Sequence, residues 1–223
     1  MLIEAIFFAG IVSVAVQALG QLEAKAVAAE PQRQVSPRVK QGLDVADQLY
    51  TAKRYHSAEK AYLAVLKHDH KNLSAYNHLG IIYSQLKNFP DAIECFLIAT
   101  QLMPSATTFH NLGLVYYENR NYIKAIAAYE KSIMFEPSAP RYIALGKAFS
   151  KVLDHRRMIT ALEHARNLDP ANLRTLHLLL DAYVHTKQPD LASQTARRIL
   201  ELEPKDAKAS QVLARYPKHP QVA

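Results

Sequence analysis

The 223-residue sequence has little cysteine, little glycine and no tryptophan. Its one cysteine, Cys95, cannot form an internal disulfide, which excludes a disulfide-stapled fold. We find no glycine-rich phosphate loop, no H-E-x-x-H, no G-x-S-x-G and no C-x-x-C. We therefore expect a protein that is not an enzyme and needs no cofactor.

The sequence also lacks residues with the spacing of metal ligands. The ten histidines are scattered, and His68 and His70 stand together without a third ligand nearby. We therefore expect no metal site.

What the sequence does contain is an internal repeat, best seen in residues 73–105. Leu79, Gly80 and Tyr83 are spaced to share one face of a helix. A second helical face follows at Ala92, Phe96 and Ala99, before Pro104 closes the segment. Similar residues recur 33, 66 and 100 positions later, and self-similarity at this period is typical of stacked helix pairs. With so little glycine, we expect an almost entirely helical protein.

The repeat resembles the tetratricopeptide repeat (TPR) in its Leu-Gly, Tyr, Ala, Phe, Ala and Pro positions. The resemblance implies an all-α, right-handed solenoid of about five TPR-like hairpins over residues 39–206. The repeats are 39–72, 73–105, 106–138, 139–172 and 173–206. In the fifth repeat Leu180 replaces the usual glycine, so we expect its two helices to lie further apart. Residues 207–223 are expected to form a capping helix and a tail, with Ala207, Val212 and Leu213 covering the end of the solenoid.

An apolar segment comes first, and we expect a hydrophobic helix over residues 1–24 with a linker over 25–38. The run from Ala5 to Leu22 carries no charge, and its eighteen residues would span about 27 Å as a helix. Basic residues follow the run, which favours a single-pass membrane anchor with the repeats in the cytoplasm. The alternative is a secretory signal cleaved at Ala26-Val27-Ala28, with an exported or periplasmic protein as its product.

The family resemblance implies a binding groove, because the first helix of each hairpin lines the concave face in such proteins. The residues carried over to that face are Tyr50, Asn77, Ile81, Gln85, His110, Leu114, Tyr117, Lys147, Lys151, Arg174, His177 and His185. Residues 139–223 hold 14 Lys/Arg and 8 Asp/Glu, a net charge of +6, which would attract an acidic peptide, anionic lipid headgroups or nucleic acid. Basic and acidic residues are interleaved without a nucleic-acid-reading motif, which argues against nucleic acid.

These observations predict a protein-interaction scaffold that binds a peptide or protein segment and assembles a complex at a membrane. Two alternatives remain at this point: an exported chaperone or assembly factor, and an architectural spacer that associates with itself.

Overall fold

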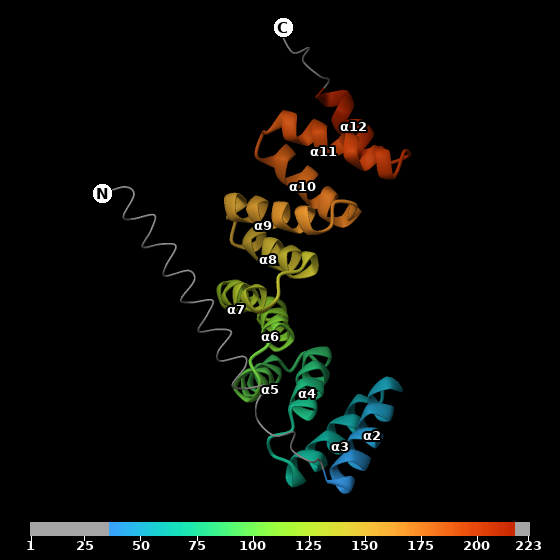
Figure 1. The fold of residues 1–223 in the computed structure, drawn as a ribbon, viewed down its shortest axis with the longest axis vertical. Coiled ribbons are helices and arrows are strands. Elements are labelled where there is room, and N and C mark those ends of the chain that lie inside the picture. The colour runs from blue at the N-terminus through green and yellow to red at the C-terminus, as the bar shows by residue number, and fades with distance from the viewer. Residues whose placement is uncertain (1–35, 217–223) are drawn as a thin grey trace, which may run out of the picture. The chain divides into compact units, whose positions relative to one another are not determined.

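The computed structural model describes residues 36–216, and all regular structure in this range is helical. The chain divides into two units, Met1–His70 and Lys71–Ala223. The first contains α2 (Pro37–Thr51) and α3 (Tyr55–His68). The second contains α4 (Leu73–Gln85), α5 (Phe89–Leu102), α6 (Ala106–Glu118), α7 (Tyr122–Phe135), α8 (Ala139–Lys151), α9 (His155–Leu168), α10 (Leu173–His185), α11 (Pro189–Leu202) and α12 (Ala207–Arg215) (Figure 1).

Several of the first helices of the hairpins, and the terminal helix α12, begin after a residue whose side chain caps the helix. Asn72, Ser105, Asn172 and Asp206 precede α4, α6, α10 and α12, and each side chain accepts a hydrogen bond from a backbone amide in the first turn. Such caps satisfy amides that have no partner inside the helix. Pro90 lies in the first turn of α5, where its missing N–H costs no hydrogen bond.

The turn inside each hairpin is closed by a residue in the left-handed conformation. In the α4–α5 turn, the amide of Asn88 donates to the carbonyl of Tyr83, and the amide of Lys87 donates to that of Ser84. This pair of bonds is the Schellman motif, which requires a positive φ at its αL position. Five turns have this conformation, at Lys53, Lys87, Arg120, Leu153 and Lys187, with φ between 56° and 59°.

The two helices of a hairpin meet where a small residue faces a large one sixteen positions later. A Cβ added to Gly80 would lie 2.7 Å from Phe96, and one added to Gly113 would lie 2.6 Å from Tyr129. Glycine is therefore required for the close approach of these helices. In the fifth repeat the order is reversed: Leu180 is fully buried, and the residue sixteen positions later is Ala196, also fully buried. The small partner compensates for the missing glycine.

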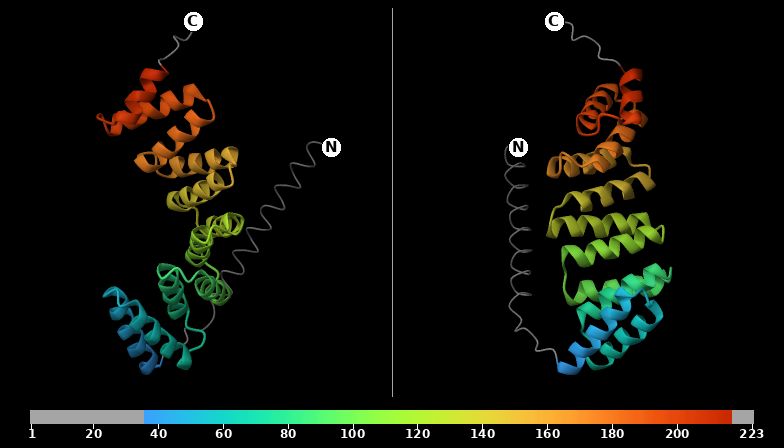
Figure 2. Two further views of the ribbon diagram at one scale, coloured as in Figure 1. Left: turned by 180° about the vertical axis from the view of Figure 1, so that it is seen from behind. Right: turned by 90° about the vertical axis from the view of Figure 1, so that its right-hand side faces the viewer.

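Within the unit Lys71–Ala223, the hairpins stack in chain order, each second helix packing against the first helix of the next hairpin (Figure 2). Helix α12 packs against α11 at the C-terminal end. Val212 and Leu213 contact the core there as expected, but the fully buried residue is Ala209. The expectation that Ala207 covers this end is wrong, because that residue is exposed at the first turn of α12.

The predicted hydrophobic helix at residues 1–24 and most of the linker lie outside the described residues. Among the helices that the structure does describe, none combines the length and the apolar character needed to cross a bilayer.

Candidate functional site

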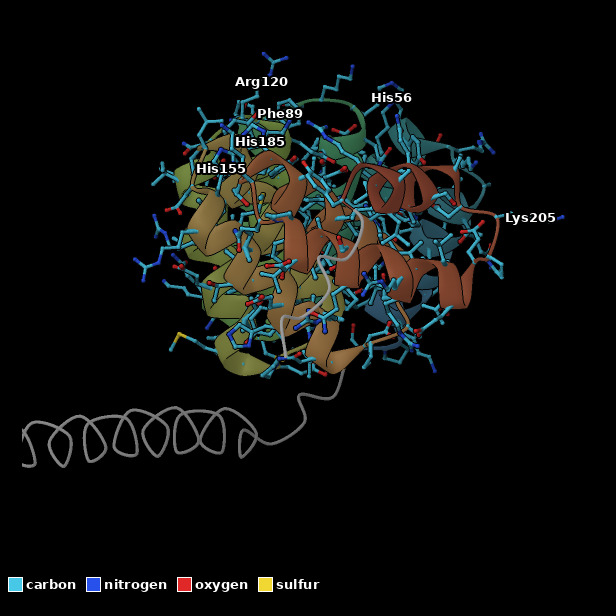
Figure 3. All side chains as sticks on the ribbon, turned by 90° about the horizontal axis from the view of Figure 1, so that it is seen from above. His56, Phe89, Arg120, His155, His185 and Lys205 are labelled. Carbon is cyan, nitrogen blue, oxygen red and sulfur yellow. The ribbon has the colours of Figure 1, made fainter. Side chains whose placement is uncertain are left out.

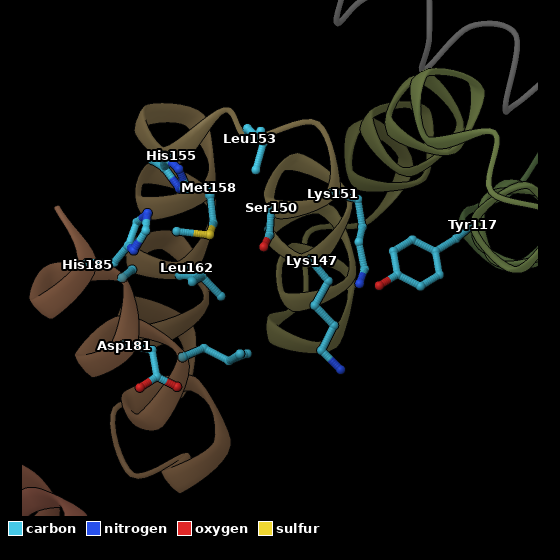
Figure 4. A pocket seen from close by; sticks show the side chains of 13 residues that line it. Tyr117, Lys147, Ser150, Lys151, Leu153, His155, Met158, Leu162, Asp181 and His185 are labelled. Carbon is cyan, nitrogen blue, oxygen red and sulfur yellow. The ribbon is translucent and has the colours of Figure 1, made fainter.

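A cavity of about 600 Å³ opens between α8, α9 and α10 (Figure 4). Met158, Leu162 and Leu178 give it an apolar floor. Lys147, Ser150 and Lys151 lie along α8, and His155, Asp181 and His185 lie on the other helices that line it. An apolar floor with a few polar groups above it is the composition of a ligand-binding site.

A second cavity, of about 420 Å³, adjoins the first and shares Tyr117 and Lys147 with it. It lies between α6 and α8 and is lined by His110, Leu114 and Tyr129 as well as by Arg174 at the start of α10. We call the two cavities together the basic groove. It extends along three successive hairpins of one unit, which is the form of a site for an extended segment rather than for a compact small molecule.

The cations of the basic groove have no counter-ions of their own. Among residues 36–216, no carboxylate pairs with Lys147, Lys151 or Arg174. Burial lowers the pKa of Lys147, and the nearby Arg174 lowers it further. A negatively charged ligand would be attracted to both Lys147 and Arg174 and would offset the repulsion between them. The groove therefore favours an anionic ligand.

The one carboxylate of the first cavity is already neutralised. Asp181 accepts from the ammonium of Lys208 on α12 at 2.5 Å. The cations of α8 therefore determine the charge that a ligand meets.

Two histidines of the groove carry buried nitrogens that have no hydrogen-bond partner among residues 36–216. His110 Nδ1 is one, and burial, followed by the charge of Arg141, lowers the pKa of this imidazole. His155 Nδ1 is the other, and its ring lies 4.7 Å from that of His185, centroid to centroid. A buried polar atom without a partner is a place where a ligand atom or water can bind at little cost.

The sequence-predicted site residues separate into two groups. Those that line the basic groove are His110, Leu114, Tyr117, Lys147, Lys151, Arg174 and His185. Asn77, Ile81 and Gln85 lie on α4, away from both cavities, and Tyr50 lies on α2 in the other unit, 6.1 Å from the ring of Tyr55. His177 instead contacts Asp206, with 3.2 Å between Nε2 and Oδ2.

Sequence reasoning missed His155, because the predicted positions fall only on the first helix of each hairpin. His155 begins the second helix of its hairpin, α9, and reaches the first cavity from that helix's first turn.

One group of described residues has the composition of a metal site: His177, Glu203 and Asp206 bring their ligand atoms within 4.8 Å of one another. Asp206 already uses both oxygens inside the protein. Its Oδ1 accepts from the amide of Ala209 and caps α12, and its Oδ2 pairs with His177. Helix capping and ion pairing therefore account for this arrangement without a metal.

The fold is a solenoid of stacked helical hairpins. The tetratricopeptide-repeat model matches residues 73–105, 106–139 and 173–206, so the chain contains tetratricopeptide repeats. Among curated protein sequences, none matches this chain.

Solved structures share the fold. One is the crystal structure of MamA, 28% identical, with a TM-score of 0.68 over 74% of this chain and 97% of that one. MamA from Desulfovibrio magneticus RS-1 is 19% identical, with a TM-score of 0.70 over 77% and 98% of the two chains. YrrB, described as a tetratricopeptide repeat protein with an unusual peptide-binding site, is 15% identical, with a TM-score of 0.65 over 78% and 90%. At these lower identities the likeness concerns the fold alone.

Proposed function

We propose that this chain is a non-catalytic interaction protein whose basic groove binds an acidic, extended segment of a partner protein. The observation that carries the proposal is the row of Lys147, Lys151 and Arg174 along adjoining cavities, without counter-ions among the described residues. Lys147 is partly buried beside the exposed Lys151 and Arg174, so a ligand carboxylate gains both attraction and hydrogen bonds when it binds these cations.

The geometry also fits an extended peptide rather than a helix lying in the groove. Tyr117, Ser150 and His185 place hydroxyl and imidazole groups along the opening, where they can bond a peptide backbone (Figure 4). The apolar floor of Met158, Leu162 and Leu178 accommodates one aliphatic side chain of the ligand. Tetratricopeptide repeats generally mediate protein–protein interaction and typically act as non-catalytic scaffolds, which supports the same assignment.

The second part of the proposal is that the chain recruits or assembles its complex at a membrane, with the repeats on the cytoplasmic side. The uncharged run from Ala5 to Leu22 and the basic residues after it support this part. Mass spectrometry of the mature N-terminus tests it. An intact Met1 in the membrane fraction is expected, whereas a chain beginning near residue 29 would mean an exported protein.

Site-specific photo-crosslinking tests the groove directly. A photoreactive amino acid replaces Ser150, which is exposed inside the groove, and in a matched variant it replaces Gln194 on α11, which lies in a different cavity between α9 and α11. We expect a discrete partner adduct from position 150 and none from position 194. Adducts from position 194 alone would place partner binding on the outer helices and overturn the proposal.

A further inference from the structure

The turns inside the hairpins carry a feature that the fold does not need. In the unit Lys71–Ala223, the αL positions of the four Schellman turns are Lys87, Arg120, Leu153 and Lys187. Glycine is the usual residue there, because a side chain in this conformation brings Cβ too close to the backbone. None of the four is glycine, and three are basic. When a strained backbone position is occupied repeatedly by basic residues, we expect their side chains to have a function.

Those side chains make no ion pair within the part of the chain that the structure describes. Lys87, Arg120 and Lys187 are exposed, and no carboxylate lies within ion-pair distance of them. Leu153 is 74% exposed. Among the described residues, the backbone strain at these positions is therefore not offset by an ion pair.

The four turns lie on one side of their unit. Seen from above, Phe89, Arg120, His155 and His185, one from each turn, gather on the same side, and Lys205 lies on the opposite side (Figure 3). We call the turns, residues 86–91, 119–124, 152–157 and 185–190, the turn edge. We call the segments between hairpins, residues 103–105, 136–138, 169–172 and 203–206, the connection edge.

The two edges carry opposite charges. The turn edge holds six Lys/Arg and three Asp, a net charge of +3. The connection edge holds one Lys and four Asp/Glu, a net charge of −3. Of the acidic residues on the turn edge, Asp154 is held by Arg157 in an ion pair of 2.6 Å. The unit therefore presents a cationic side and an anionic side, which would orient it against a charged surface.

Large apolar side chains stand among the cations of the turn edge. Ile123 is 68% exposed and Leu153 is 74% exposed, and Leu86 is 38% exposed beside Lys87. Cations flanking exposed aliphatic groups match the interface of an anionic bilayer, where ammonium groups meet lipid phosphates and aliphatic groups enter the acyl boundary. The same chain also carries the uncharged run Ala5–Leu22.

We infer that the turn edge is a membrane-contacting surface that binds anionic phospholipid headgroups. The inference deepens the membrane part of the proposed function and rests on cations other than those of the basic groove, although His155 and His185 belong to both surfaces. It assigns the helical repeats a contact with lipid that is separate from any insertion of the N-terminal segment.

Because the natural chain has no tryptophan, a single introduced tryptophan reports on one place. Ile123→Trp puts the probe at the start of α7, on the turn edge, and Met134→Trp puts it near the end of the same helix, where Met134 is 73% exposed. The two positions are about 16 Å apart along the helix. Each full-length variant is mixed with vesicles of pure phosphatidylcholine, and with vesicles containing about one third phosphatidylserine.

We expect the emission of Ile123→Trp to move to shorter wavelength with phosphatidylserine vesicles, and that of Met134→Trp to stay unchanged. Binding to vesicles of pure phosphatidylcholine measures the contribution of the N-terminal segment. The additional binding to vesicles that contain phosphatidylserine therefore measures the contribution of the turn edge. Adding Lys87→Gly, Arg120→Gly and Lys187→Gly removes three cations and should weaken the phosphatidylserine-dependent binding roughly 100-fold.

Glycine suits the αL backbone, so this triple variant should unfold at no lower temperature than the parent. Its affinity for a groove ligand should also be unchanged, which separates failure of this inference from failure of the groove. The inference would be overturned if the emission of both probes shifted equally, or if the shift did not depend on phosphatidylserine. It would also be overturned if the triple variant retained the shift.

Discussion

The pairing of Gly113 with Tyr129 gives a stability prediction that can be worked out from the contacts. A Cβ at position 113 would lie 2.6 Å from Cδ1 and 2.7 Å from Cε1 of the tyrosine ring. That ring is 2% exposed, so a larger side chain at position 113 must displace it from a buried position beside the second cavity. Gly113→Leu therefore overpacks the hairpin and should cost about 3 kcal/mol of unfolding free energy, at the upper end of the usual range.

The opposite change leaves a void. Tyr129→Ala removes a buried ring and should cost about 3–5 kcal/mol, as for other buried aromatic residues. The double variant Gly113→Leu/Tyr129→Ala recreates the order found at Leu180 and Ala196, which are both fully buried. The leucine then fills the space of the ring, so we expect a loss of about 3 kcal/mol, against about 6–8 if the single losses simply added.

Urea unfolding followed by circular dichroism measures all four proteins. The matched control is Gly42→Ala, whose Cβ would lie 3.0 Å from one methyl group of Val65 and needs only a small adjustment. A double variant whose loss equals the sum of the single losses would refute the idea that the two positions share one volume.

Three further predictions follow from titratable groups and from the turns. Burial, and then Arg141, lower the pKa of His110 in the folded protein. The neutral imidazole therefore contributes its full stabilisation above the ordinary pKa of about 6.5, and this stabilisation is lost as the pH falls towards the lowered pKa. His110→Gln should flatten the fall in melting temperature in that window, and an equally steep fall would contradict the assignment. Burial, with Glu94 and then Asp91, raises the pKa of the Cys95 thiol to about 12. Its reaction with a disulfide reagent at about pH 8 should be roughly 1,000-fold slower than in denaturant, and a rapid native reaction would show that the thiol is accessible. Each Lys or Arg to Gly change at an αL position should raise unfolding free energy by about 0.5–1 kcal/mol, because relief of strain exceeds the added chain entropy. Urea midpoints check this, and lower midpoints would mean that the basic side chains stabilise the fold.

Most of the hairpin architecture could be predicted from the sequence, because its packing rule is local. Small and large residues sixteen positions apart indicate which helices pair, and Pro and cap residues indicate where they begin. The fifth repeat shows the limit of a rule applied at one position. Leu180 alone suggests a wider hairpin, but Ala196 provides the missing space.

The site was less predictable, since it depends on partners that the repeat pattern does not contain. His177 lies at an expected groove position but contacts Asp206, which caps the helix after the last repeat. Asp181 is neutralised by Lys208 from that same helix. His155 reaches the cavity from the second helix of its hairpin. The prediction considered only the first helix of each hairpin and therefore could not find it.

A direct binding measurement tests whether the cations of the basic groove hold an acidic segment. Peptides selected from a random library on the full-length chain are titrated against that chain and against Lys147→Glu/Lys151→Glu. The matched control is Arg197→Glu/Arg198→Glu, which makes the same change in charge on α11, beside a different cavity. We expect the selected peptides to be rich in Asp and Glu, and only the groove variant to lose binding. Peptides without acidic residues, or equal loss in both variants, would contradict this expectation.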